Sequence, residues 1–155
     1  MAAGFEPQIF SLITFGINMN GKLGLNKEEL KEGFLKYQFD GVSSSAIVRP
    51  TPLTKIKTNV IKIACGHHHT LVVDSSGNLF AWGMGNQGCI GDGMYVDVNE
   101  PKLINEQFQG QKVQDCGCGS YHSLVILSNG DVYSWGVNSR GQLGIGNKEN
   151  VPPFH

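Results

Sequence analysis

Two stretches of the chain carry nearly the same sequence at a constant offset of 53 positions. The first reads CGHHHTLVVDSSGNLFAWGMGNQGCIGDG from Cys65, and the second reads CGSYHSLVILSNGDVYSWGVNSRGQLGIG from Cys118. The offset is the same at the first and last glycines of the two stretches, so no residue is inserted or lost across the unit. Repeats of this length predict supersecondary units that stack on one another, because one unit alone cannot bury its apolar face.

A third, weaker copy lies near the N-terminus and reads LITFGINMNGKLGLN. In this copy Phe15 occupies the position of Trp82 and Trp135 in the other two. Gly16 and Gly83 are 67 positions apart, which exceeds the repeat offset by 14. The difference predicts an insertion between the first and second copies.

Each full copy predicts an antiparallel meander of short strands. In the second unit, Val60–Cys65 and Asn78–Trp82 show apolar residues alternating with polar ones, and His69–Asp74 is a compact apolar run. The segment around Pro101 to Ile104 predicts a fourth strand at the sheet edge, where proline is tolerated. Four strands per unit are typical of a propeller blade.

We therefore predict a single repeat domain over residues 1–155. It consists of unit one at 9–59, unit two at 60–112 and an incomplete unit three at 113–155, with an insertion in unit one at about 26–46. The insertion predicts a short helix from Asn26 to Tyr37, with Asn26 as its N-cap. Leu30 and Phe34 lie on one face of that helix and either pack on the blade or dock a partner. Gly33 weakens the helix, so that packing on another surface is needed to hold it.

Composition and charge exclude several classes of function. The formal net charge is −1, with 12 basic and 13 acidic residues, which disfavours direct contact with nucleic acid. The chain has neither a long apolar run nor a signal peptide, which argues against a membrane-bound protein and predicts an intracellular one, in the cytoplasm, the nucleus or an organelle. No motif for nucleotide hydrolysis, zinc proteolysis or serine hydrolysis is present, so we predict no catalytic residue, no cofactor and no enzymatic activity.

The repeat itself separates framework positions from variable ones. Residues that recur at the repeat offset are expected to be structural, and they are Gly66, His69, Trp82, Gly83, Gly119, His122, Trp135 and Gly136. We predict no metal site, because the recurrence of His69 and His122 favours a local structural role; a zinc site of Cys116, Cys118 and His122 is the alternative.

Four positions differ between the copies inside the otherwise constant G-x-x-H turn. They are His67 and His68 in the second unit and Ser120 and Tyr121 in the third. A constant framework with variable loop tips is how a repeat protein presents a binding face, so these four residues are candidate partner contacts. The alternative for His68 is an ordinary solvated loop histidine.

The string CG-x-x-H-[TS]-L, the aromatic strand that ends in Trp-Gly and the segment from Asn138 to Gly144 together resemble the regulator of chromosome condensation repeats. The resemblance implies an all-β fold: a partial β-propeller of four-stranded antiparallel blades, with the short helical insertion between units one and two. Members of this family look like seven-bladed propellers, which need roughly 370 residues. The sequence therefore predicts less than half a ring, which either needs a covering partner or is a piece of a longer product.

The resemblance implies two classes of function. The first is a non-enzymatic protein-interaction module or adaptor subunit, whose partner is another protein or a second chain that completes the propeller. The alternative is an exchange or regulatory factor for a Ran-type small GTPase. Fold resemblance alone does not choose between them.

Overall fold

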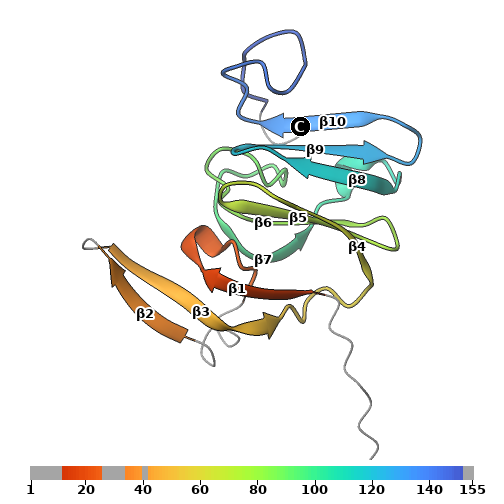
Figure 1. Ribbon diagram of the computed structural model, residues 1–155. Coiled ribbons are helices and arrows are strands. Elements are labelled where there is room, and N and C mark those ends of the chain that lie inside the picture. The colour runs from red at the N-terminus through yellow and green to blue at the C-terminus, as the bar shows by residue number, and fades with distance from the viewer. Residues whose placement is uncertain (1–11, 26–33, 40–41, 152–155) are drawn as a thin grey trace, which may run out of the picture.

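The computed structural model describes residues 12–25, 34–39 and 42–151, and these form three antiparallel sheets. Figure 1 shows the sheets following one another along the chain, with the strands of the third sheet nearest the C-terminal end. The first sheet has the order β1-β3-β2, the second β4-β5-β6-β7 and the third β10-β9-β8. This arrangement confirms the all-β fold of successive blades.

The second sheet is the complete four-stranded blade. Its strands are β4 (Val60–Cys65), β5 (His69–Asp74), β6 (Leu79–Gly83) and β7 (Val98–Leu103). The three meander strands and the edge strand with Pro101 were all expected from the sequence. A 3₁₀ turn, η2 (Glu106–Phe108), leads from β7 to the third sheet.

The third sheet repeats the first three strands of this blade. They are β8 (Val113–Cys118), β9 (His122–Leu127) and β10 (Val132–Gly136). The fourth position is taken by a single antiparallel bridge between Gly136 and Val151. Val151 is the counterpart of Val98, which pairs with Gly83 at the start of the fourth strand of the second sheet.

The first sheet differs from the prediction. It contains β1 (Ile13–Ile17), β2 (Phe34–Phe39) and β3 (Val42–Pro52), and η1 (Met19–Gly21) follows β1. The prediction of a helix as far as Tyr37 is wrong from Phe34 onward, because β2 pairs with β3 along its whole length. Residues 26–33, which include Leu30 and the expected N-cap, lie outside the described residues.

The sequence contains the reason for this difference. Leu35, Tyr37 and Phe39 alternate with polar residues, which is the period of a strand, and aromatic residues favour strands. Gly33 disfavours helix by about 1 kcal/mol relative to alanine. The helical pattern of Leu30, Phe34 and Tyr37 therefore competes with an equally good strand pattern, and pairing with β3 decides the outcome.

The core lies between the sheets rather than within any one of them. All six residues of β5 are buried, because alternate side chains of this strand point into two different clusters. Leu71 and Val73 join residues of the third sheet, including Val125 and Leu127. Val72 belongs to a second cluster, which also contains Leu25, from the segment after β1, and Leu53, from the segment after β3. The second sheet is thus held on both faces by its neighbours.

Candidate functional site

Two turns at the same end of neighbouring sheets form the candidate site. One turn joins β4 to β5 at Gly66, and the other joins β8 to β9 at Gly119. Each glycine N–H donates to the carbonyl of the histidine three residues later, at 2.9 Å in both turns. A side chain at either glycine would collide with the ring of that histidine, His69 or His122, so the turn requires glycine.

The four variable residues of these turns meet across the junction between the sheets. The His67 N–H donates to the Ser120 carbonyl at 3.1 Å, and His67 Nδ1 lies 3.2 Å from the Tyr121 hydroxyl. The His67 ring stacks on His68 at a centroid distance of 4.7 Å and meets Tyr121 edge-on at 5.7 Å. We call His67, His68, Ser120 and Tyr121 the loop cluster.

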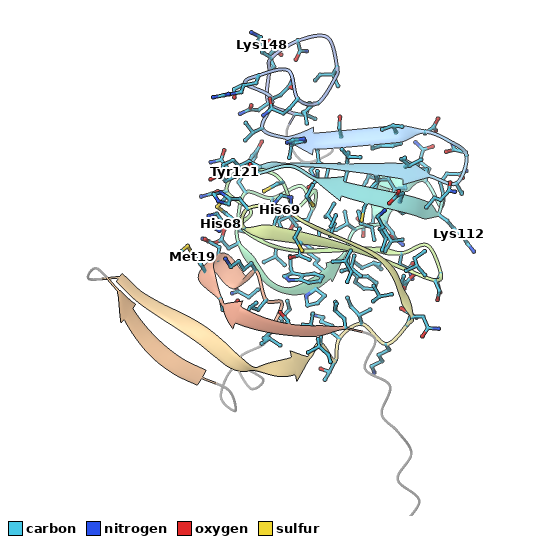
Figure 2. The ribbon with its side chains drawn as sticks, in the orientation of Figure 1. Met19, His68, His69, Lys112, Tyr121 and Lys148 are labelled. Atoms are coloured by element: carbon cyan, nitrogen blue, oxygen red, sulfur yellow. The ribbon has the colours of Figure 1, made fainter. Side chains whose placement is uncertain are left out.

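The loop cluster is accessible but partly enclosed. His67 and Ser120 are exposed, whereas His68 and Tyr121 are half-buried. Desolvation lowers the pKa of His68 below its ordinary value, and the nearby His67 and Lys22 lower it further. Figure 2 shows His68 and Tyr121 on the same side of the molecule, with Met19 of η1 further along that side. The cluster therefore presents aromatic surface with hydrogen-bonding groups.

Met19 is exposed on the same side of the molecule as the loop cluster, and it was not among the candidate contact residues predicted from the sequence. Its side chain is 42% exposed, and it belongs to the loop that follows β1. The repeat offers a signal, because the corresponding loop positions are Asn86 and Ser139 in the other units, so this position also varies. Phe34, the other candidate contact, begins β2, while Leu30 lies outside the described residues. The loop cluster is therefore defined by the four turn residues alone.

Hydrogen bonds beneath the loop cluster join one sheet to the next. Trp82 Nε1 donates to the Lys22 carbonyl and Trp135 Nε1 to the Cys89 carbonyl, both at 2.9 Å. The Ser123 hydroxyl also donates to the Cys89 carbonyl, at 2.7 Å. Each tryptophan therefore anchors its own sheet to the loop of the preceding unit.

His69 completes this network. Its Nε2 lies 3.0 Å from Ser123 Oγ, and because that hydroxyl hydrogen is already donated to Cys89, His69 Nε2–H is the donor. The side chain is 1% exposed. Burial lowers the pKa of His69 to about 4; the charges of the nearby His122 and His68 act in the same direction, whereas a backbone hydrogen bond with His122 acts in the opposite one. His69 is therefore neutral at physiological pH and fixes the turn below the loop cluster.

Gly83 and Gly136 occupy equivalent places at the ends of the tryptophan strands. Both have positive φ, +111° and +103°, and a side chain at either would collide with the carbonyl oxygen of the opposite turn, that of His68 or Tyr121. The next residue along donates its N–H to the same carbonyl, at 2.8 Å for Met84 and 2.9 Å for Val137. These glycines let the strand ends pass close to the turns that present the loop cluster.

Cys89 and Cys116 are buried and Cys118 is half-buried, so these three belong to the framework, whereas Cys65 is exposed. Burial raises the pKa of Cys116 to about 12 and also raises the pKa of Cys118. Among the residues that the structure describes, no three His, Cys, Asp or Glu side chains lie close enough together to hold a metal ion. Within the same residues, no helix is long and apolar enough to cross a membrane.

Comparison with protein families gives one consistent match. The model of the regulator of chromosome condensation (RCC1) repeat matches residues 11–73 and 76–126, and a second model of the same repeat matches 60–89 and 113–142. These ranges include both turns of the loop cluster.

Curated relatives share this repeat. The human X-linked retinitis pigmentosa GTPase regulator is 34% identical over 141 residues, which are 90% of this chain and 12% of that protein. The mouse E3 ubiquitin-protein ligase HERC2 is 30% identical over 94% of this chain, and the human probable E3 ubiquitin-protein ligase HERC6 is 38% identical over 63%. The chain spans 3% and 10% of these two relatives, so it matches only a small part of each.

Solved structures show the same fold. Human WBSCR16 superposes with a TM-score of 0.70 at 20% identity, over 91% of this chain and 33% of that one. Prp20p from Saccharomyces cerevisiae, described with its binding to Gsp1p and histones, superposes with a TM-score of 0.70 at 22% identity. That match covers 90% of this chain and 32% of Prp20p.

Proposed function

Because the chain belongs to the regulator of chromosome condensation repeat family, we propose that it is a non-enzymatic protein-interaction module, an adaptor subunit of a larger intracellular assembly. The observation that carries the proposal is the loop cluster. The positions that vary between the repeats come together on one surface, while the recurring His69, Trp82 and Trp135 form a buried framework beneath it.

The chemistry of the loop cluster suits a protein partner. Tyrosine is enriched at the energetic centres of protein interfaces, because its ring supplies apolar area and its hydroxyl a hydrogen bond. Here Tyr121 is already oriented by His67, so binding loses little side-chain entropy. The four free cysteines among the described residues fit a reducing compartment.

We expect the double variant His67→Ala/Tyr121→Ala to weaken partner binding by about tenfold or more. The partner would first be captured from a lysate with the wild-type chain and identified, and its affinity would then be measured by titration calorimetry. Lys112→Ala is the matched control, because Lys112 lies at the opposite end of the strands (Figure 2) and is exposed. Equal affinity of the wild type and the double variant would contradict the proposal.

A second candidate function is regulation of a small GTPase, because a relative that matches 90% of the chain is named a GTPase regulator. On this hypothesis the loop cluster contacts the nucleotide site of the partner. Release of a fluorescent guanine nucleotide would be timed for a panel of Ran-type GTPases with and without the chain. Acceleration that is lost in His67→Ala/Tyr121→Ala would support this function, and unchanged release across the panel would remove it.

A further inference from the structure

The loop between β6 and β7 carries three consecutive apolar side chains that are largely exposed. Met94, Tyr95 and Val96 are 56%, 56% and 62% exposed. Neither core cluster of the described residues includes any of them. Single exposed apolar residues are common on protein surfaces, but a contiguous group of them marks a site of interaction. We call Met94, Tyr95 and Val96 the apolar tip.

Polar contacts hold the loop on both sides of the apolar tip. On one side, Asp92 Oδ1 accepts from the Met94 N–H at 3.1 Å, and Asp92 Oδ2 lies 2.8 Å from Lys102 Nζ. On the other side, Asp97 Oδ1 accepts from the Gly85 N–H at 3.0 Å. The apolar tip therefore belongs to a loop that is already shaped, and binding does not have to order it first.

The third unit builds the equivalent loop without apolar side chains. Its Asn138 N–H donates to Asn150 Oδ1 at 2.8 Å, and these two residues are the counterparts of Gly85 and Asp97 at the repeat offset. The three positions of the apolar tip are occupied there by exposed polar residues, Asn147, Lys148 and Glu149. A loop closed by an equivalent hydrogen bond therefore does not need apolar side chains, so those of the apolar tip are explained by what they bind.

A carboxylate lies directly beside the apolar tip. Asp97 is exposed, and none of the ion pairs among the described residues includes it. Its Oδ2 accepts from Asn20 Nδ2 at 3.0 Å, which joins this loop to η1 of the first unit, where Met19 is also exposed. The counterpart of Asp97 in the third unit is the uncharged Asn150. Apolar side chains next to a negative charge are complementary to an apolar surface that is bordered by a cation.

The loop of the apolar tip lies at the same end of the second sheet as the loop cluster. It leaves the sheet after Gly83 and returns at Val98, and these two residues pair with each other. The N–H of Met84, the first residue of the loop, donates to the His68 carbonyl at 2.8 Å. One partner can therefore contact both surfaces.

We propose that the apolar tip inserts into an apolar groove of a folded protein partner, with a lysine or arginine of the partner beside Asp97. This contact rests on the proposed function and names the chemistry of the partner. Three consecutive exposed side chains on a loop form a convex surface, so the surface that covers them is concave. Methionine adapts its shape to such a groove, and tyrosine adds a large, rigid area. A membrane fits less well, because the negative charge of its cytoplasmic surface repels Asp97.

Photo-crosslinking identifies the surface that the apolar tip touches. The photoreactive residue p-benzoylphenylalanine replaces Tyr95 in one chain and its exposed counterpart Lys148 in a control chain, and both are irradiated in a cell lysate. We expect position 95 to give defined protein adducts in about tenfold excess over position 148. The attached segment should be apolar, with a lysine or arginine nearby. Equal adducts at the two positions, or attachment to a polar surface, would overturn the proposal.

The third unit supplies a matched variant of the apolar tip. Met94→Asn/Tyr95→Lys/Val96→Glu gives the loop the residues of its counterpart and leaves the net charge of the chain unchanged. We expect this triple variant to weaken affinity for the cross-linked partner by about tenfold or more, and to change the unfolding constant in urea by less than about fivefold. His67→Ala/Tyr121→Ala is measured with the same partner. If only the loop-cluster variant weakens binding, the present proposal fails; if only the triple variant does, the role of the loop cluster fails instead.

Asp97→Asn tests the charge of the contact. Asparagine keeps an Oδ1 atom for the Gly85 N–H, as Asn150 does for Asn138 in the third unit. We expect association with the partner to slow by about threefold or more at low salt, and the difference to disappear at high salt. Equal association rates at every salt concentration would overturn the cation beside Asp97. Co-sedimentation with phosphatidylcholine and phosphatidylserine vesicles that the triple variant abolishes would assign the apolar tip to a membrane, which also overturns the proposal.

Discussion

Replacing Trp135 by alanine is expected to lower the free energy of unfolding by about 3–5 kcal/mol. The side chain is 0% exposed and belongs to the cluster between the second and third sheets. Its loss opens a cavity, removes the hydrogen bond to the Cys89 carbonyl and leaves Gly91 without its neighbour. Urea unfolding followed by circular dichroism would measure the effect, which is large compared with the stability of a small domain.

Two further variants separate the causes of this loss. Trp135→Phe keeps most of the apolar ring but removes the N–H donor, so we expect a loss of about 1–3 kcal/mol. Val132→Ala, on the same strand, should cost less than about 0.5 kcal/mol, because Val132 is 66% exposed. If Trp135→Ala and Val132→Ala had similar effects, the junction between the sheets would not depend on the indole.

The strands could be predicted because the same pattern of apolar, polar and turn residues occurs in two copies of the repeat. The bounds expected for β4 and β5 agree with the structure, and β6 differs by one residue at each end. The insertion has no second copy for comparison, and the spacing of its apolar residues fits a helix as well as a strand. The pairing of β2 with β3 joins residues on both sides of Gly41. No sequence pattern within either strand predicts this pairing.

The candidate site could be predicted only as a set of positions. The constant offset separated His67 and Tyr121 from the framework, but their hydrogen bond joins turns 54 positions apart and depends on how one sheet packs on the next. The same is true of the indole bonds, whose acceptors are backbone carbonyls of Lys22 and Cys89. A backbone acceptor leaves no residue type in the sequence to mark it.

Acidification should destabilise the fold through His69. Its pKa is about 4 in the folded state and 6.5 when exposed, so between these values the unfolded chain binds a proton that the folded chain does not. Stability is therefore unaffected by this group above about pH 6.5 and falls as the pH drops toward 4. We expect a loss of about 2–3 kcal/mol between pH 7 and 4.5, measured as urea midpoints and slopes at each pH.

The neighbours of His69 determine how this result is interpreted. The pKa of His68 is also lowered, so its protonation on acidification destabilises the fold in the same direction, whereas the lowered pKa of Asp74 places the contribution of that carboxylate at more acidic pH. His69→Gln keeps an N–H for Ser123 but cannot titrate, so its stability should vary much less over this range, with only the part due to His68 remaining. Ser123→Ala removes the hydrogen bond but leaves a buried imidazole, so the acid dependence should persist at lower overall stability. If the stability of His69→Gln fell with decreasing pH as steeply as that of the wild type, the acid sensitivity would arise from groups other than His69. The hydrogen-bond network that supports the loop cluster would then be insensitive to pH.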